Sequence, residues 1–320
     1  PLITGVMCVG FLLAAIGCDA GGASNAKPRF APPNAAQDGS QEALNMNEMV
    51  RNGKLLASGQ KLSDFRLKLF LDKAAPGDIR EVLASNNLLT STGVKTIMSA
   101  ASTSSMTTLY LNNNAVGNEG LAAVASSPRL ANLQWLQLSA VKADSDGVKS
   151  LASAEHVPAG LKGLTLSYNA VSDAGAQALA TMKWPGSVEL VQCKIGGQGA
   201  RELIQKTSWG ALNLSDNPIG PGGLDGLSGV SASLGQIMLD KCKLGDGGVK
   251  ALAAAPAPAL RVLSLRYNGL TDAGIDALIA APWLPTLKTL TLTAHGASSK
   301  ARQRLIDAWG QRPGLNVAAP

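Results

Sequence analysis

The chain has little of the chemistry on which most enzymes depend. Only two histidines and four cysteines occur among its 320 residues. Neither His156 nor His295 has cysteines or carboxylates nearby at the spacing of metal ligands. A nucleophile elbow, a phosphate-binding glycine loop and paired catalytic carboxylates are also missing from the sequence. These absences favour a protein that is not an enzyme and that uses no metal, no other cofactor and no small-molecule substrate.

Runs of charge of one sign are absent as well. The formal net charge is +6, yet Lys and Arg form no run and alternate with acidic residues. A solvated outer surface explains this mixture better than a nucleic-acid site does. We therefore expect no nucleic-acid partner.

What the sequence does contain is a unit of about 26 residues that recurs along most of the chain. Residues 164–180 (LTLSYNAVSDAGAQALA) and 263–279 (LSLRYNGLTDAGIDALI) place apolar residues, an Asn and a Gly in register. Units start 24 to 28 residues apart, at Val82, Leu109, Leu136, Leu164, Val188, Leu212, Ile237, Leu263 and Leu290. A repeat of this length predicts a solenoid, one continuous body in which each turn contacts its neighbours.

Each unit opens with apolar residues at its first and third positions, as in Leu164 and Leu166. This alternation predicts a short strand with one buried and one open face. The sixth position forms a column that we name the ladder: Asn87, Asn114, Val141, Asn169, Cys193, Asn217, Cys242, Asn268 and His295. A buried amide there can bond the backbone of the turn that leaves the strand. Val141 and His295 depart from this pattern, so we expect their turns to be less regular.

The second half of each unit predicts a helix. A Gly is followed four residues later by an apolar residue in eight units, among them Gly93–Ile97, Gly223–Leu227 and Gly274–Leu278. This spacing places both residues on one helix face. Because Gly destabilises a helix, we expect it to permit close approach of the helix to the strand layer. Ser172–Asp173 and Thr271–Asp272 supply N-capping oxygens.

A strand and a helix within 24–28 residues, with the TDAG and AL motifs of residues 271–278, resemble the ribonuclease-inhibitor type of leucine-rich repeat. The pattern is also similar to the GALA-type repeats of bacterial proteins. The resemblance covers roughly residues 82–317 and implies an α/β leucine-rich-repeat solenoid (horseshoe) with a parallel concave sheet and convex helices. It implies no particular ligand, because this fold serves many binding tasks. The basic partner of ribonuclease inhibitor does not suit a chain of net charge +6.

The two ends of the repeat array are expected to be capped. Residues 41–81 predict an N-terminal cap made from a degenerate repeat, in which Arg66 and Phe70 replace the Gly and its apolar partner. Residues 82–320 form the solenoid proper. It ends in a C-terminal capping helix over residues 300–310, which keeps the i, i+4 pair as Ala301 and Leu305.

The first 18 residues differ from all others. Residues 2–17 are uncharged and mostly apolar, and the string AAIGC that ends at Cys18 looks like a bacterial lipobox. In such a signal the Cys is lipidated and becomes the mature N-terminus. Ala15 stands where Leu is usual, and no basic segment precedes the apolar stretch. We predict a lipoprotein signal peptide over residues 1–18 with lipidation at Cys18, the alternatives being plain secretion and a buried apolar segment.

Residues 19–40 predict a flexible tether. They are rich in Gly, Ala, Pro, Ser and Asn and cannot bury a core. A flexible chain of this length spans roughly 25 Å, which suits a spacer between a lipid anchor and a folded body. We therefore expect the protein at the bacterial cell envelope, anchored to a membrane by lipid, with its folded part periplasmic or extracellular.

The four cysteines do not form a disulfide framework. Cys8 and Cys18 lie in the signal peptide region, and Cys193 and Cys242 occupy ladder positions two turns apart. With strands about 4.8 Å apart, the Cα atoms of the latter pair lie about 10 Å apart, beyond disulfide reach. We expect Cys193 and Cys242 to be buried free thiols.

The open strand face is the candidate binding site. It holds all three tyrosines and one of the five tryptophans, and aromatics on a polar surface are typical of protein recognition. The candidate residues are Tyr110, Asn112, Trp135, Gln137, Tyr168, Glu189, Asp216, Asp240, Arg266 and Tyr267. Tyr168 and Tyr267 could instead pack over the strand ends. The other tryptophans are expected in the core: Trp184, Trp209, Trp283 and Trp309.

Together these features predict an envelope-anchored lipoprotein that binds a protein, or else a glycan, through its concave face. The alternative, implied by the GALA resemblance, is an effector-like adaptor for a host or cytoplasmic protein. Such adaptors need an additional recruiting domain, and residues 41–54 are too short to supply one.

Overall fold

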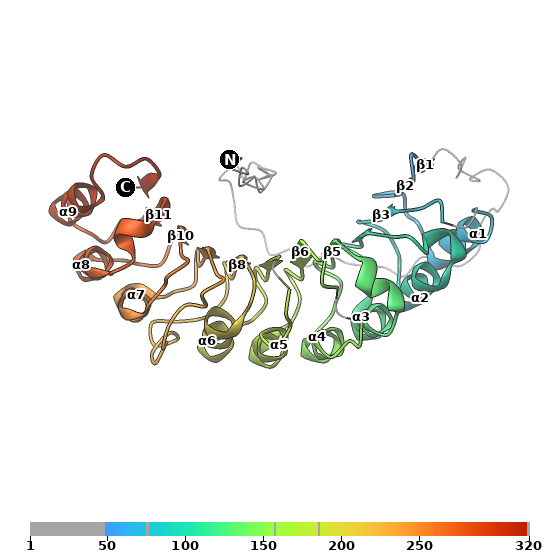
Figure 1. Cartoon of the computed structure of the whole chain (residues 1–320), viewed down its shortest axis with the longest axis horizontal. Coiled ribbons are helices and arrows are strands. Elements are labelled where there is room, and N and C mark those ends of the chain that lie inside the picture. Colours follow the sequence, from blue (N-terminus) through green and yellow to red (C-terminus); the bar gives the residue numbers. More distant parts are fainter. Residues whose placement is uncertain (1–48, 75–76, 157, 185, 319–320) are drawn as a thin grey trace, which may run out of the picture. The chain divides into compact units, whose positions relative to one another are not determined.

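A computed structural model describes residues 49–318 except for 75, 76, 157 and 185. The predicted signal peptide, its Cys18 and the tether lie outside the described residues. Short strands alternate with helices along the described chain (Figure 1).

The strands form one sheet in which they follow each other in chain order. They are β1 (Val50–Arg51), β2 (Lys54–Leu56), β3 (Glu81–Leu83), β4 (Thr108–Tyr110), β5 (Trp135–Gln137), β6 (Gly163–Thr165), β7 (Ser187–Glu189), β8 (Ala211–Asn213), β9 (Gln236–Met238), β10 (Val262–Leu265), β11 (Thr289–Thr293) and β12 (Leu315–Ala318). Neighbours pair in parallel, apart from the antiparallel pair β1–β2.

The helices connect successive parallel strands. They are α1 (Asp64–Leu71), α2 (Ser91–Ser99), α3 (Gly117–Ala125), α4 (Ser145–Ala152), α5 (Ser172–Leu179), α6 (Gly197–Lys206), α7 (Gly245–Ala254), α8 (Asp272–Ala280) and α9 (Ser299–Trp309). Short 3₁₀ helices lie at Ala101–Thr103, Pro128–Asn132 and Leu284–Thr286. No described helix is both long and apolar enough to span a membrane.

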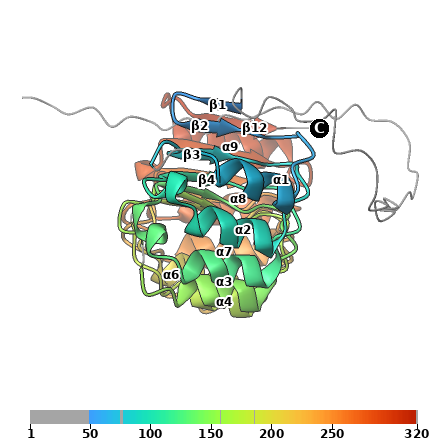
Figure 2. The same cartoon turned by 90° about the vertical axis from the view of Figure 1, so that its right-hand side faces the viewer.

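In the body formed by residues 49–318, the strands line the inner, concave side and the helices the outer, convex side (Figure 1). The view turned by 90° shows α2, α3 and α4 stacked in chain order (Figure 2). A single hydrophobic core lies between the two layers, from Met49 to Trp309. The expected α/β leucine-rich-repeat solenoid with a parallel concave sheet and convex helices is confirmed.

The register predicted from the repeat is also confirmed. Leu109 pairs with Val82 on one side and with Leu136 on the other, and the series continues through Leu290. Each of these residues is the first apolar residue of its unit. Their side chains are buried because they point away from the open face into the core.

One unit lacks the predicted helix. Residues 218–235, all of them described, form turns between β8 and β9. Leu227 is partly buried against the core, so the apolar position is used although the helix is not formed. The physical reason is the high glycine content, which makes helix formation costly: Gly220, Gly222, Gly223, Gly226 and Gly229.

The helix glycines serve a different purpose from the one expected. Gly93, Gly147, Gly199 and Gly274 permit contact with a side chain of the preceding turn, whereas Gly120, Gly175 and Gly248 lie against the side chain four residues earlier. A Cβ on Gly199 would lie 2.6 Å from Oδ1 of Asp173, and one on Gly147 would lie 2.6 Å from Oδ1 of Asn118. In both cases the acceptor belongs to the preceding turn. The glycine leaves room for a polar side chain that bonds the start of the next helix.

The two predicted N-caps behave differently. The Thr271 hydroxyl accepts a hydrogen bond from the amide of Ala273 at 3.4 Å, so it caps α8 as expected. Ser172 does not cap α5, because its backbone is left-handed with φ of 54° and its amide donates to the Cys193 carbonyl at 3.0 Å. Asp173 also acts outside its own helix, accepting from the amide of Gly196 at 2.6 Å.

The ladder amides are buried and link neighbouring turns. The Asn217 side-chain amide donates to the carbonyls of Leu190 at 2.7 Å and of Leu214 at 2.8 Å. Its Oδ1 accepts from the amides of Cys193 at 2.9 Å and of Ile195 at 3.0 Å. The predicted bonding inside the turn is confirmed, and the same side chain also bonds the preceding turn.

The turn of Val141 is more regular than expected. Val141 is fully buried, and its amide and that of Ala143 both donate to Oδ1 of Asn169 at 3.1 Å. Both amides reach one oxygen because Lys142 between them is left-handed, with φ of 62°. His295, by contrast, is exposed, so the ladder does not continue into the last turn.

Candidate functional site

The open face presents two rows of side chains within the strands. Trp135, which pairs with Thr108 and Gly163, lies in the row at the first strand position. Tyr110, which pairs with Gln137, lies in the row at the third position. The two aromatics lie on adjacent turns, as predicted from the sequence. They occupy different rows, however, because Trp135 is at the first position of its strand and Tyr110 at the third.

Trp135 has a structural neighbour on the next strand. A Cβ on Gly163 would lie 2.6 Å from Cζ3 of the Trp135 ring. The glycine therefore makes room for the indole to lie against β6, and Trp135 is half-buried for this reason. Its contribution to binding is limited to the part of the ring that remains open.

The polar candidates Asn112 and Gln137 bond each other. The Asn112 side-chain amide donates to Oε1 of Gln137 at 2.8 Å, and its own Oδ1 accepts from the amide of Ser139 at 2.8 Å. Asp240 is used in a similar way, accepting from the Ser264 hydroxyl at 2.6 Å and from the amide of Arg266 at 2.8 Å. These side chains join turns together as well as lining the surface.

Burial shifts two ionisable groups of the concave face. It raises the pKa of the Glu189 carboxyl. Burial also raises the pKa of Tyr110, and the negative charge of Glu81 adds to this effect. Both side chains are half-buried on the third-position row of the open face. They offer a partner a carboxyl group and a neutral phenol in a partly desolvated place.

Tyr168 and Tyr267 lie beyond the strands, at the carboxyl edge of the sheet. Their relative exposures of 59% and 60% show that they do not pack over the strand ends. Both are left-handed, with φ of 61° and 55°. Nζ of Lys241 lies 5.9 Å from the centre of the Tyr267 ring and 3.8 Å from Oδ1 of Asp216. Tyr168, Asp216 and Tyr267 thus lie directly before ladder residues, beyond the strand rows.

The remaining tryptophans are in the core, as predicted. Trp184, Trp209, Trp283 and Trp309 have relative exposures of 2%, 0%, 3% and 2%. The rings of Trp184 and Trp209 contact each other, with centroids 5.3 Å apart. Cys193 and Cys242 are buried and unpaired, which confirms the expectation that they are free thiols.

Sequence reasoning missed a group of exposed lysines at the same edge. Lys142, Lys194 and Lys243 each follow a ladder residue that is not Asn, and all three are left-handed, with φ of 62°, 59° and 55°. The sequence signal was present in the strings QCKIGG and KCKLGD of residues 192–197 and 241–246. It was masked because Lys is ordinarily taken as a solvated surface residue.

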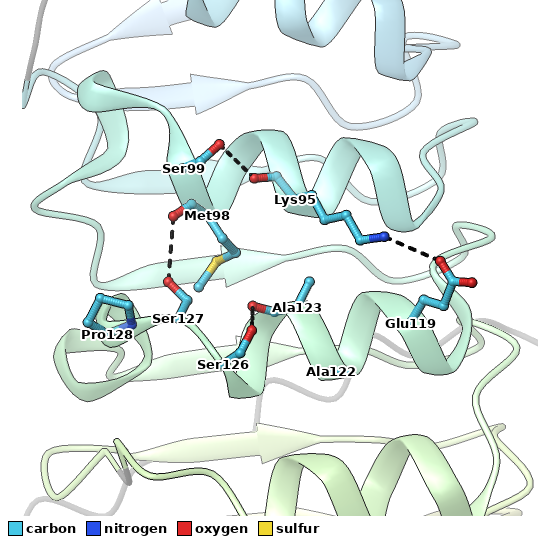
Figure 3. A pocket seen from close by; sticks show the side chains of 9 residues that line it. All are labelled: Lys95, Met98, Ser99, Glu119, Ala122, Ala123, Ser126, Ser127 and Pro128. Carbon is cyan, nitrogen blue, oxygen red and sulfur yellow. Dashed lines mark hydrogen bonds and ion pairs between the residues drawn. The ribbon is translucent and has the colours of Figure 1, made fainter.

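The convex side carries a shallow groove of about 610 Å³ between α2 and α3 (Figure 3). An ion pair between Lys95 and Glu119 at 3.3 Å closes one end, and Met98 and Pro128 lie toward the other. The Ser127 hydroxyl donates to the Met98 carbonyl at 3.5 Å. The polar groups are thus largely paired with one another. In the described part of the chain, no three His, Cys, Asp or Glu side chains are grouped as metal ligands would be.

Comparison with known proteins supports the repeat assignment. A family model described as Leucine Rich repeat matches residues 104–125, 161–180, 211–228 and 258–278. No curated protein matches the chain.

Two solved structures are similar to parts of the chain, each with a TM-score below 0.5. One, titled as the crystal structure of the mouse RP105/MD-1 complex, is 16% identical, with a TM-score of 0.48 over 76% of this chain and 39% of that chain. The other, titled as the crystal structure of the Rad7 and Elc1 complex in yeast, is 15% identical, with a TM-score of 0.45 over 80% of this chain and 71% of that chain. The chain therefore spans about two fifths of the length of the mouse chain. The four matched segments are thus similar to leucine-rich repeats.

Proposed function

We propose that the chain is a non-catalytic binding module that takes a protein partner on its concave face. The observation that carries this proposal is the continuous open face of the sheet, on which Tyr110, Trp135 and Glu189 are displayed half-buried. Solenoid repeats use such extended concave surfaces for binding. Partly desolvated aromatic groups are the side chains that contribute most to protein interfaces.

The hydrogen bonding of the face favours a protein over a glycan. The hydrogen-bonding side chains Asn112, Gln137 and Asp240 are engaged with neighbouring turns. A glycan needs many free donors and acceptors for its hydroxyl groups, whereas a protein partner can gain most of its affinity from buried aromatic area. A glycan partner is thus the less favoured alternative.

We also propose that the module is held at the bacterial cell envelope by lipid on Cys18. The support is the AAIGC string, the apolar residues before it and the tether composition of residues 19–40. Attachment at one end of a flexible segment would leave the concave face accessible to a partner in the periplasm or outside the cell.

A comparative capture experiment tests the binding proposal. The immobilised chain is incubated with an extract of the cells that produce it, and bound material is quantified. The variant Tyr110→Ala with Glu189→Ala should lose at least about tenfold in capture, since hot-spot truncations cost on the order of 2 kcal/mol. The matched convex variant Lys95→Ala with Glu119→Ala should retain it.

Treatment of the extract distinguishes the partner classes. Protease treatment should abolish capture, whereas periodate oxidation of glycans should leave it intact. Capture that survives protease, or that the concave variant leaves unchanged, would contradict the proposed function.

A further inference from the structure

The carboxyl edge of the sheet forms a surface of its own. We name this the carboxyl-edge surface and define it by Lys142, Tyr168, Lys194, Lys241, Lys243 and Tyr267, all of them exposed. The residues on either side of a ladder residue point to solvent. Lys241 and Lys243, for example, are exposed, whereas Cys242 between them is buried. Both flanking side chains therefore leave the same turn toward solvent.

The carboxyl-edge surface has a left-handed backbone. All six residues are left-handed, with φ between 54° and 62°. That conformation costs an ordinary side chain roughly 1 kcal/mol, which Asn and Gly largely avoid. Asn86 and Asn113 occupy the equivalent position in earlier turns, with φ of 58° and 55°. Ala140, Gln192 and Asp216 share this position and its left-handed backbone, so the repeat itself imposes the conformation. Tyr168 and Tyr267 are distinguished by their large side chains, which stay exposed there.

The three lysines that directly follow ladder residues are regularly spaced along the sheet edge, and their side chains are not used in ion pairs within the described residues. Lys142, Lys194 and Lys243 stand on every second turn. With strands about 4.8 Å apart, the lysines are spaced by about 9.6 Å. Within the described residues, none of the three has an ion pair. Tyr168 stands on the turn between the first two, and Tyr267 one turn beyond the third.

We propose that the carboxyl-edge surface binds an extended polyproline II segment with an acidic residue at every third position. A polyproline II helix has three residues per turn and rises about 9.3 Å per turn, which matches the lysine spacing. Acidic side chains at positions i, i+3 and i+6 would meet Lys142, Lys194 and Lys243. Exposed tyrosines are the groups against which prolines pack in this mode of recognition.

A single-stranded nucleic acid fits the same surface less well. Its bases need aromatic rings in succession. Tyr168 and Tyr267 are four turns apart, so their rings do not follow in succession. A β-strand also fits less well, because residues three apart point to opposite faces.

The inference rests on the proposed function in one respect, namely that the partner is a protein. The test uses a fluorescein-labelled peptide of Glu-Pro-Pro repeated three times, with binding to the full chain followed by anisotropy. A Gln-Pro-Pro peptide of the same length and a peptide of the same composition with its three Glu residues adjacent serve as controls. We expect at least about tenfold tighter binding of the Glu-Pro-Pro peptide than of either control.

Two variants locate the binding surface. Lys142→Gln with Lys194→Gln and Lys243→Gln should weaken peptide binding at least about tenfold. The matched variant Lys162→Gln with Lys250→Gln and Lys288→Gln removes the same charge from exposed lysines elsewhere and should change binding less than about twofold.

Tyr168→Asn should also weaken binding while leaving the thermal midpoint unchanged or higher, since Asn tolerates φ of 61° better. A purely structural role for Tyr168 would not give that combination.

Three results would overturn the inference. They are equal affinity for the acidic and neutral peptides, no effect of the carboxyl-edge lysine variant, and tighter binding of a single-stranded oligonucleotide than of the acidic peptide. Failure of peptide binding while partner capture by the concave face persists would overturn this inference alone. Loss of protease-sensitive capture would instead remove the proposed function on which it rests.

Discussion

Asp246 holds Thr271 of the next turn through two hydrogen bonds. The Thr271 amide donates to Oδ1 at 2.9 Å and its hydroxyl donates to Oδ2 at 2.5 Å. The same carboxylate occupies the space next to Gly274, where any Cβ would clash with Oδ1. Asp272 bonds Ser298 in the same way at the following turn. The TDAG motif is therefore a contact between turns as much as a helix start.

This contact predicts coupling between Asp246 and Gly274. Asp246→Ala should destabilise the fold by about 1–2 kcal/mol through the loss of two partly exposed hydrogen bonds. Gly274→Ala should cost about 1–3 kcal/mol because the new methyl displaces the carboxylate. In the double variant the second cost should largely disappear, as measured by denaturant unfolding. Asp225→Ala, at an exposed loop position, is the control. Additive losses would show that the two residues are independent.

Replacement of a ladder amide should be among the most damaging single changes. Asn217→Leu leaves buried carbonyls and amides of two turns without partners, and we expect a loss on the order of 2–4 kcal/mol. Asn132→Leu, at an exposed position, should cost less than about 0.5 kcal/mol. A measured loss below about 1 kcal/mol for Asn217→Leu would contradict the bonding described for this side chain.

The ladder thiols predict a dependence of stability on alkaline pH. Burial raises the pKa of both Cys193 and Cys242 to about 12, whereas an unfolded thiol ionises near roughly 8.5. The unfolded chain therefore releases protons that the native chain retains, and stability falls as pH rises between these values. Each thiol contributes a loss of about 1.4 kcal/mol per pH unit in that window.

Unfolding midpoints measured at neutral pH and near pH 10 check this expectation. The variant Cys193→Ala with Cys242→Ala is the control, because it keeps every other titrating group. Its midpoint should fall less steeply with pH than that of the parent chain. The native thiols should also resist alkylation at neutral pH, as read by peptide mass spectrometry, and become reactive on unfolding. Equal slopes for parent and variant would refute the assignment.

Lipidation at Cys18 is predicted from the sequence. The substitution Cys18→Ser should move the protein from the detergent phase to the aqueous phase on partition, because an acyl anchor contributes about 0.8 kcal/mol per buried CH₂. Intact-mass measurement should show the acyl groups on the parent chain and not on the variant. Cys8→Ser is the matched control and should partition like the parent. Unchanged partition of Cys18→Ser would leave the apolar segment itself as the anchor, or no anchor.

The fold could be predicted from the sequence because its structural unit is repeated. Nine unit starts were placed by apolar alternation, and eight successive pairings join them in the sheet, from Val82–Leu109 to Leu263–Leu290. The burial of Asn217 and of the free thiols followed from the same frame. These properties depend on residues close in the chain. The same pattern recurs in several units, which supports each prediction independently.

Only the tertiary structure decided what residues one turn apart do to each other. It showed that Gly199 makes room for Asp173, that Ser172 is left-handed and does not cap its helix, and that residues 218–235 form no helix. It also placed Tyr168 at the sheet edge beside Lys142 and Lys194 of the neighbouring turns. Apart from the missing helix, which follows from local glycine content, these features join residues more than 20 positions apart. They depend on side-chain direction and backbone handedness, which apolar periodicity does not encode.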